Sequence, residues 1–338
     1  WMLSANGTIF TYEYEAIIPG LLKRWYAERQ EMQQKMRDCG DNEIEKAYWD
    51  KRQLVKKINL NSLYGALLNP GSRFNDPRMG QSTTLTGRTI ARHMGAKVNE
   101  LFTGIYDHVG DSIIYGDTDS VYFSAYPVFK SQIESGEFAW DKDKVTELYE
   151  TVCDQANETF PDYMATAHNV LNREQGKIIA AAREVSATAG LYITKKRYAI
   201  LVYDNEGHRE DKDDKPGKIK AMGLDLKRSD TPAFMQDFLS ELLLKTLTGA
   251  NEDEIIERII DFRSEFRNMP AWLKGTPKRV NKLTHYFNSE YMIDPKTGDE
   301  IYKGKANMPG HVRAAINYNR MRRMNSDRYS MEIMDGMK

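Results

Sequence analysis

Two aspartates lie two residues apart in the hexapeptide YGDTDS, residues 115–120. Apolar residues flank it on both sides, so we expect two strands joined by a short turn, with the acids at the tip of a buried hairpin. Side chains two apart in an extended chain point the same way, so Asp117 and Asp119 would converge on one spot. Two such carboxylates repel each other unless a cation neutralises them, and Mg²⁺ prefers oxygen ligands. The pair predicts a magnesium site of the kind that serves phosphoryl transfer with two metal ions.

The same two residues also fit an ordinary acidic turn. An EF-hand loop is disfavoured, because the further acidic position, the glycine and the distal glutamate of that motif are missing at the required spacing. Asp117 and Asp119 by themselves leave the choice between a metal site and a plain turn open.

A second polar group lies on a segment with helical periodicity. Lys57, Asn61 and Tyr64 are spaced i, i+4 and i+7, which places them on one stripe of a helix, and Gln53 continues that stripe. A cation, an amide and an aromatic ring in line suit a nucleotide: charge for the triphosphate, amide for polar anchoring, ring for base or sugar. A solvated stripe with Tyr64 half-buried is the alternative.

The elements that must position these residues can be outlined from local signals. Residues 19–37 are helical, with Pro19 in the first turn, and residues 43–68 form a second helix that stops at Asn69-Pro70-Gly71. The polar turn 38–42 between them predicts an antiparallel helical hairpin. Residues 71–225 mix a helix at 82–102 with strand signals at 112–115, 121–123 and 198–203. Helical patterns return at 234–247 and 252–266, and we expect 210–220 to be a solvated charged loop.

Bulk composition narrows the class of protein. The 338 residues are 41% hydrophobic and 29% charged, which is typical of a soluble globular protein with two or three compact units. No apolar run is long enough to span a membrane and no signal peptide is visible, and two cysteines fit a reducing cytoplasm. The net charge of −1 gives no support for nucleic-acid binding, so local clusters must supply any such surface.

Three strings in order resemble the sequence motifs of family B DNA polymerases: KINLNSLYG at 57–65, YGDTDS at 115–120 and KKRY at 195–198. Further matching pieces are STTLTGR at 82–88, MGL at 222–224 and HVR at 311–313. Together they look most like the replicative polymerases of T-even-type phages, and the resemblance runs from about residue 10 to the end.

The resemblance implies an α+β fold with helical-hairpin fingers, an antiparallel-sheet palm and a mainly helical thumb. The segments would be a palm remnant at 1–18, fingers at 19–70, palm at 71–225 and an incomplete thumb at 226–338.

The resemblance also assigns roles to single residues of the fingers. Lys57 and Arg29 match cations that contact the triphosphate of a dNTP. The family often has another basic residue four positions after Arg29, where this chain has Gln33 with Lys35 nearby. Asn61 and Tyr64 match residues that line the pocket of the nascent base pair, and Gly65 would permit close approach of the template.

In the palm, Asp119 matches the carboxylate that binds both Mg²⁺ ions and Asp117 its weaker partner. Glu184, in AREV at 182–185, matches a third carboxylate near the metals, although a lone Glu is more often solvated or salt-bridged.

Residues 195–198 are expected to alternate along a strand, with Lys196 and Tyr198 on one face. Lys196 would lie in the minor groove of the new duplex, where correct base pairs present the same acceptors. Arg228 resembles a contact to a primer phosphate, which would give salt-sensitive binding without sequence preference. The DNA-contacting set implied by the resemblance is Gly65, Lys195, Lys196, Arg197, Tyr198 and Arg228.

The family takes another metal-bridging aspartate from an upstream Asp-x-x-Ser-Leu-Tyr-Pro segment, and this sequence contains no such string. Trp1 is interpreted as a cut point. We therefore expect a fragment that is inactive alone and that completes its site with an N-terminal polymerase–exonuclease portion. Primer-template DNA and dNTP are the other expected partners, and a sliding clamp would be bound through a tail beyond Lys338.

Two other classes of function remain open. One is a non-catalytic module that binds primer-template DNA, and the other is an unrelated Mg²⁺-dependent phosphohydrolase. The latter would need a nucleophile or base beside the acids, and none of the six histidines accompanies Asp117 and Asp119.

Overall fold

The computed structural model describes residues 1–40, 42–213 and 215–338. Asp41, in the expected polar turn, and Asp214, in the expected charged loop, lie outside the described residues. The chain divides into two compact units, and each is considered by itself. The first comprises residues 1–186 and 205–208, and the second comprises residues 187–204 and 209–338.

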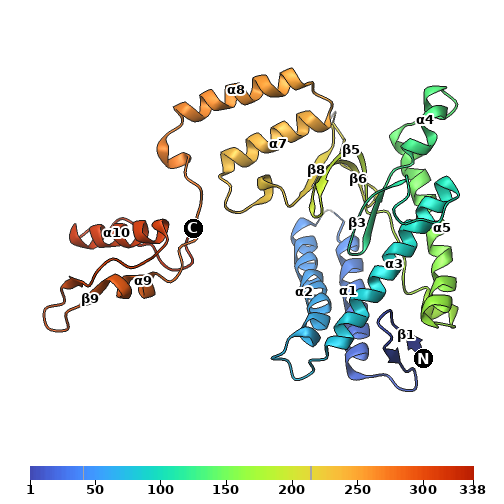
Figure 1. Ribbon diagram of the computed structural model, residues 1–338, viewed down its shortest axis with the longest axis horizontal. Coiled ribbons are helices and arrows are strands. Elements are labelled where there is room, and N and C mark those ends of the chain that lie inside the picture. The colour runs from blue at the N-terminus through green and yellow to red at the C-terminus, as the bar shows by residue number, and fades with distance from the viewer. Residues whose placement is uncertain (41, 214) are drawn as a thin grey trace. The chain divides into compact units, whose positions relative to one another are not determined.

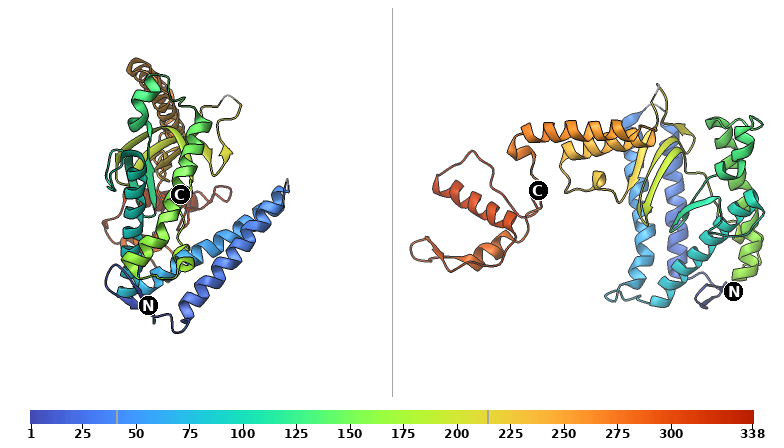
Figure 2. Two further views of the ribbon diagram at one scale, coloured as in Figure 1. Left: turned by 90° about the vertical axis from the view of Figure 1, so that its right-hand side faces the viewer. Right: turned by 45° about the horizontal axis from the view of Figure 1, so that its top comes forward.

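Two long helices of the first unit form the expected helical hairpin (Figure 1). Helix α1 (Ile17–Asp38) has Pro19 in its first turn, and α2 (Glu43–Leu68) ends just before Asn69 and Pro70. The Asn42 side chain caps α2 by accepting a hydrogen bond from the Glu45 N–H at 3.2 Å. The two helices pack against each other and project from the rest of this unit (Figure 2, left). The predicted bounds 19–37 and 43–68 agree with the structure to within two residues.

The rest of the first unit packs around two further long helices, α3 (Pro77–Thr103) and α5 (Lys142–His168). Ala96 and Val98 of α3 are buried, as are Ala156 and Phe160 of α5, and the two helices contact each other. The predicted helix at 82–102 corresponds to most of α3, whereas α5 was not predicted. The smaller elements are α4 (Tyr126–Glu134), α6 (Arg173–Gly176) and two antiparallel pairs, β1 (Met2–Leu3) with β2 (Ile9–Phe10) and β3 (Ile113–Asp117) with β4 (Ser120–Phe123).

A four-stranded sheet supplies most of the strands of the second unit. Its order is β5 (Val185–Thr194), β6 (Arg197–Asn205) and β7 (His208–Arg209), and β8 (Lys218–Met222) pairs antiparallel with β6. Every residue of β6 from Tyr198 to Asp204 is buried, which explains the nearly continuous apolar run of that strand. Glu206 and Gly207, in the tight turn between β6 and β7, both have positive φ.

Helical elements follow the sheet, beginning with η1 (Asp225–Lys227), α7 (Ala233–Leu247), α8 (Glu252–Asn268) and η2 (Ala271–Leu273). Helices α7 and α8 pack through the stacked rings of Phe238 and Phe262, whose centroids are 3.6 Å apart. The predicted helices at 234–247 and 252–266 are confirmed.

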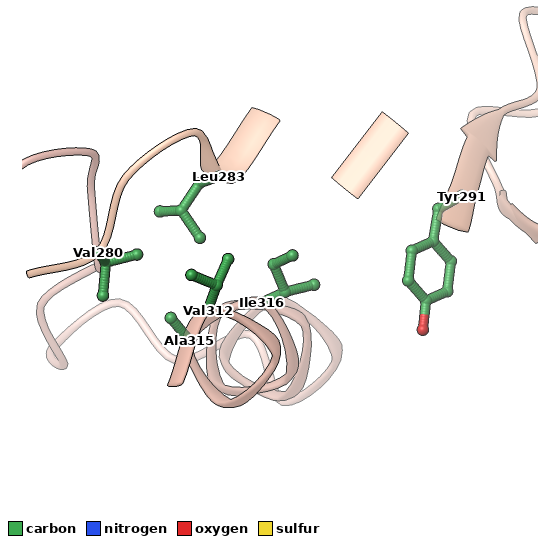
Figure 3. Close-up of a cluster of buried hydrophobic side chains, with 6 residues drawn as sticks. All are labelled: Val280, Leu283, Tyr291, Val312, Ala315 and Ile316. Carbon is green, nitrogen blue, oxygen red and sulfur yellow. The ribbon is translucent and has the colours of Figure 1, made fainter. Parts of the chain in front are cut away.

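The last part of the chain has its own small core (Figure 3). It joins α9 (Leu283–Glu290), the pair β9 (Tyr291–Ile293) and β10 (Glu300–Tyr302), and α10 (Gly310–Met324). The core residues are Val280, Leu283, Tyr291, Val312, Ala315 and Ile316. Beside them the buried Glu290 carboxylate pairs with Arg313 at 2.8 Å.

The fold is α+β, as expected. Cys39 and Cys153 are both free thiols. Among the described helices, none combines the length and apolar character needed to cross a bilayer.

His93 of α3 is a buried polar side chain in the first unit. Its ring stacks on Tyr163 with centroids 4.0 Å apart, and its two nitrogens lie 2.8 Å from the Tyr106 hydroxyl and 3.0 Å from Thr159 Oγ1. Burial, and secondarily the charge of Lys97, lowers the pKa of His93 to about 4. The imidazole is therefore neutral in the folded protein at pH values where an unfolded chain would protonate it.

This shift predicts acid sensitivity of the first unit. Because the unfolded state binds the extra proton first, the free energy of unfolding should fall as pH drops from about 6.5 to about 4, by up to about 3 kcal/mol. Urea unfolding of wild type and His93→Gln at pH 7.5, 6, 5 and 4 would measure it. The difference between the two proteins should shrink as the pH falls, and a constant difference would contradict the assignment.

Candidate nucleotide and metal site

The two aspartates lie at the tip of the β3–β4 hairpin. Asp117 is the last residue of β3 and pairs with Ser120, so Thr118 and Asp119 form the turn. Thr118 has φ of 55°, in the left-handed region, and its hydroxyl donates to Asp117 Oδ1 at 3.1 Å. Strand alternation therefore stops at Asp117, and the expectation that both acids share one strand face is wrong. Both carboxylates nevertheless belong to the same end of one hairpin.

The hairpin is less buried than expected. Asp117 is half-buried, Asp119 is exposed, and Ile114 of β3 is 49% exposed. The hairpin is held on one side by Phe123, whose ring lies 5.9 Å from Phe102 of α3 and 5.0 Å from Tyr149 of α5. Aromatic contacts to two helices thus position a strand pair that would be only marginally stable alone.

A buried amide also positions the hairpin. Asn99 of α3 accepts a hydrogen bond from the Ser112 N–H at 3.1 Å and donates to the Ile105 carbonyl at 2.9 Å. Asn99 and Ser112 are almost fully buried, at 1% and 0% exposure. The Asn99 side chain therefore holds in place the loop that leads directly into β3. Neither Asn99 nor its loop was identified from the sequence, because an isolated Asn in a helical pattern carries no signal of what it will contact.

Glu184 lies on the wall of a cavity and not at the tip of the β3–β4 hairpin. It lines a cavity of about 510 Å³ together with residues of α5 and the 206–207 turn. In that cavity Arg183 pairs with Glu150 at 2.8 Å, and Cys153 is half-buried. Within the described parts of the chain, no three His, Cys, Asp or Glu side chains are arranged to hold a metal. The role of Glu184 as a third metal-site carboxylate stays a prediction.

The predicted nucleotide stripe occupies an exposed face of α2. Lys57, Asn61 and Tyr64 are all exposed, and Lys57 forms no ion pair with any described residue. The neighbouring Lys56 is different, since it pairs with Glu28 of α1 and lies 5.7 Å from the Trp25 ring. One of two consecutive lysines thus joins the helices, and the other extends to solvent.

Arg29 of α1 meets this stripe across the helical hairpin. Its Nε donates to Gln53 Oε1 at 3.2 Å, and Gln53 lies one turn before Lys57 on α2. The structure therefore brings the two predicted triphosphate cations to the same region of the helix pair. Lys35, which lies near Gln33 in the sequence, pairs with Glu31 at 2.7 Å and lies over the Trp49 ring. A side chain built at Gly65 would meet nothing within 4 Å, so that position is open to a ligand.

The KKRY string does not lie wholly on a strand. Lys195 and Lys196 form the turn between β5 and β6, and Lys196 has φ of 60°. The expected alternation from Lys195 to Tyr198 is therefore wrong for the two lysines. Lys195, Lys196 and Arg197 are exposed. Gly223 approaches this turn so closely that a Cβ there would lie 2.1 Å from the Lys196 carbonyl oxygen.

Tyr198 is almost fully buried, at 3% exposure, and stacks on Tyr192 with centroids 5.7 Å apart. Burial, reinforced by Tyr198, raises the pKa of Tyr192 to about 12. Arg228 is exposed after η1 and pairs with Asp230 at 3.2 Å and Asp225 at 3.7 Å. A phosphate would have to compete with these carboxylates for its guanidinium.

Sequence comparison connects this chain with known proteins. Residues 4–146 match the model of DNA polymerase family B. The chain is 30% identical over 299 residues to the DNA-directed DNA polymerase of Enterobacteria phage T4, and 28% identical over 293 residues to that of Escherichia phage RB69. Each alignment covers 85% of this chain and 30% of the relative. The resemblance to family B DNA polymerases is thereby confirmed.

The particular resemblance to T-even-type phage polymerases is confirmed by the T4 and RB69 proteins. This chain spans about 30% of the length of these relatives. A solved structure, the family B DNA polymerase from the hyperthermophilic archaeon Pyrobaculum calidifontis, aligns with 99% of this chain and 34% of its own, at 18% identity and a TM-score of 0.45.

The β3–β4 hairpin with Asp117 and Asp119 at its tip is called the acid hairpin below. The contacts that hold it predict opposite effects on stability for substitutions at Asn99 and Ser112. Asn99→Ala leaves the buried Ser112 N–H and Ile105 carbonyl without this partner, and should lower the free energy of unfolding by about 2 kcal/mol. Ser112 Oγ is itself buried without a hydrogen-bond partner among the described residues. Ser112→Ala should therefore be neutral or stabilising by up to about 1 kcal/mol. Chemical denaturation measures both, and equal losses would contradict this account.

Proposed function

We propose that this chain is the C-terminal part of a DNA-directed DNA polymerase that transfers nucleotides from dNTPs to a primer 3′-hydroxyl under template direction. The observation that carries the proposal is the similarity to the T4 polymerase over 85% of the chain, with the three motifs in the family order. The helical hairpin would serve as fingers, residues 71–225 as palm and residues 226–338 as an incomplete thumb.

The acid hairpin suits divalent metal. Asp117 and Asp119 offer hard carboxylate oxygens at one exposed tip, and Mg²⁺ is commonly held by one or two carboxylates together with substrate phosphates. We assign them as the residues that would hold two Mg²⁺ ions, with Glu184 as a further carboxylate. When bound, such ions supply charge neutralisation at the attacking and leaving oxygens. The hydrogen bond from the Thr118 hydroxyl would orient Asp117 for this task.

The exposed face of α2 would bind the incoming nucleotide. Lys57 and Arg29 would contact the triphosphate, one as a point charge and the other as a planar fork. Gln53 keeps Arg29 beside the stripe without neutralising it, because an amide carries no charge. Asn61 and Tyr64 would contact the sugar and the base of the nascent pair.

Template and primer contacts would come from both units. Gly65 leaves room for the template beside Tyr64. The exposed turn of Lys195 and Lys196, followed by Arg197 and Tyr198, would contact the duplex, with Lys196 in the minor groove. Since Tyr198 is buried, its part would be to support the turn through Tyr192. Arg228 would contact a primer phosphate.

Catalysis would also require a further aspartate. Because this sequence has no Asp-x-x-Ser-Leu-Tyr-Pro string, we propose that an N-terminal polymerase–exonuclease portion carrying that segment completes the metal site. Primer extension with Mg²⁺ and all four dNTPs, by this chain with and without such a portion, tests the proposal. Extension should need both, and robust extension by the chain alone would show that the further aspartate is dispensable.

Asp119→Asn tests the catalytic role of the hairpin. With the N-terminal portion added, removal of this metal-binding charge should lower the extension rate at least about a hundredfold while primer-template affinity is retained. Asp111→Asn, at an exposed aspartate just before β3, is the matched control and should extend normally. If Asp119→Asn changed nothing, the chain would be a non-catalytic module that binds primer-template DNA.

Lys57→Ala tests whether the exposed face of α2 that carries Lys57, Asn61 and Tyr64 binds the incoming nucleotide. Loss of a charge-assisted phosphate contact should raise the KM for dNTP, or lower the incorporation rate, by about tenfold to a hundredfold, with DNA affinity nearly intact. Lys56→Ala is the contrasting variant: because Lys56 binds Glu28, it should lower thermal stability and leave the KM almost unchanged. A fall in DNA affinity for Lys57→Ala would instead make Lys57 a nucleic-acid contact.

A further inference from the structure

A hydrogen-bonded row of three side chains crosses the contact between α1 and α2 beside Lys57. Gln53 of α2 is at its centre. Its Oε1 accepts a hydrogen bond from Arg29 Nε of α1 at 3.2 Å, and its Nε2 donates to Asp50 Oδ1 at 2.9 Å. Gln53 and Arg29 are half-buried, and Asp50 is exposed. At about 100° per residue, Asp50, Gln53 and Lys57 lie within about 60° of one another around the axis of α2. The row therefore belongs to the face of α2 proposed to bind the nucleotide.

The carboxylate of Asp50 decides which end of the Gln53 amide faces Arg29. An ionised carboxylate only accepts hydrogen bonds, and a guanidinium only donates them. An amide has one accepting end and one donating end, so Gln53 satisfies both neighbours in a single orientation. The opposite orientation would set the Gln53 NH₂ group against Arg29 Nε, and Gln53 Oε1 against the Asp50 carboxylate. Asp50 thus fixes the amide as an acceptor for Arg29.

The hydrogen bond from Arg29 uses only one corner of its guanidinium. Neither Nη1 nor Nη2 of Arg29 donates to any residue that the structure describes, and Arg29 forms no ion pair with any of them. These two terminal nitrogens form the planar fork that matches two oxygens of a phosphate. Because Nε is already held, the direction of the fork is restricted before a nucleotide arrives, which lowers the entropy lost on binding.

The group that holds Arg29 is neutral, which favours an anionic ligand. A Glu at position 53 would have nearly the same shape, but it would form an ion pair that a triphosphate would have to break. The same helix contact contains such a pair, between Glu28 and Lys56. Within the row, the amide lies between Asp50 and the guanidinium, and these two charged groups form no ion pair with each other. The positive charge of Arg29 is therefore directed without being neutralised.

We propose that Asp50 and Gln53 are positioning residues for the incoming nucleotide. Asp50 fixes the Gln53 amide, and the amide directs the Nη fork of Arg29 toward the triphosphate. Both residues act through Arg29 and do not themselves contact the nucleotide. This inference rests on the proposed polymerase function, because it takes Arg29 to bind the phosphates of a dNTP.

The test measures the Kd of the full chain for dATP and for tripolyphosphate by isothermal titration calorimetry. Because the row acts on phosphate groups, each substitution should change both Kd values by the same factor. Gln53→Glu, whose carboxylate would pair with Arg29, should raise them about tenfold. Gln53→Met keeps the length of the side chain without the acceptor and should raise them about threefold. Gln53→Glu should change the melting temperature little, because the pair with Arg29 offsets the repulsion from Asp50.

Two comparisons separate positioning from a general effect of charge or structure. Asp50→Ala and Asp50→Asn remove the same charge, but only Asn keeps an acceptor for Gln53 Nε2. Asp50→Ala should therefore bind both ligands about twofold more weakly than Asp50→Asn. In an Arg29→Ala background, Gln53→Met should have no further effect on either Kd, because the residue through which Gln53 acts is gone.

Gln34→Glu is the matched control, because Gln34 of α1 lies between Arg37 and Asp38 in a similar way. It accepts from Arg37 Nε and Nη2 at 3.2 and 2.7 Å and donates to Asp38 Oδ1 at 2.8 Å, all within one helix. Both Kd values should stay at those of wild type.

Several outcomes would overturn the positioning role. These are equal effects of Gln53→Glu and Gln34→Glu, an additive effect of Gln53→Met in the Arg29→Ala background, or no binding of either ligand by wild type. The primer-extension test with the N-terminal portion decides the proposed function separately in each case. A loss of thermal stability in Gln53→Glu that parallels its loss of affinity would reduce the row to a structural contact between the helices.

Discussion

The packing of α1 against α2 decides which side chains of the helical hairpin remain for a ligand. Lys56 points into the contact between α1 and α2, where it meets Glu28 and the Trp25 ring. Lys57 is the next residue of the helix, so its side chain leaves in a different direction and points to solvent. Across the same helix contact, Gln53 holds Arg29 beside Lys57. A shift of one residue in the helix contact would exchange the two lysines. The direction in which Lys57 points depends on this register.

Two turns with strained backbones present the charged residues of the other motifs. Thr118 and Lys196 have φ of 55° and 60°, in a region that favours glycine, and such conformations are unfavourable by about 1–3 kcal/mol for other residues. Each turn is compensated locally. The Thr118 hydroxyl bonds Asp117, and the absence of a Cβ at Gly223 lets the backbone of the Lys196 turn lie against it. Short turns that carry side chains at their tips place those side chains more rigidly than long loops would.

Neutral polar groups, rather than apolar packing alone, support the acid hairpin. Asn99 ties the loop before β3 to α3, and His93 two turns earlier on the same helix joins α3 to α5 through Tyr163 and Thr159. Such groups specify one arrangement because any other would leave buried donors and acceptors unpaired. This specificity makes the unit sensitive to acid, since protonation of His93 would place a charge in its interior.

Local signals were enough to determine the helical hairpin, because the proline of α1 and the Asn42 cap and Asn69 stop of α2 act within a few residues of the ends they set. The motif strings singled out Asp117, Asp119 and Lys57, whose roles stay predictions, and the resemblance to family B DNA polymerases was confirmed by comparison. Helix α5 was missed because Pro161 and several β-branched residues weaken its helical signal. The two lysines of KKRY were assigned to a strand because the string contains no glycine, proline, asparagine or aspartate that would mark a turn. Only the tertiary structure decided that Arg29 meets Gln53 and that Asn99 holds the hairpin, since partners distant in sequence are selected by how whole helices pack.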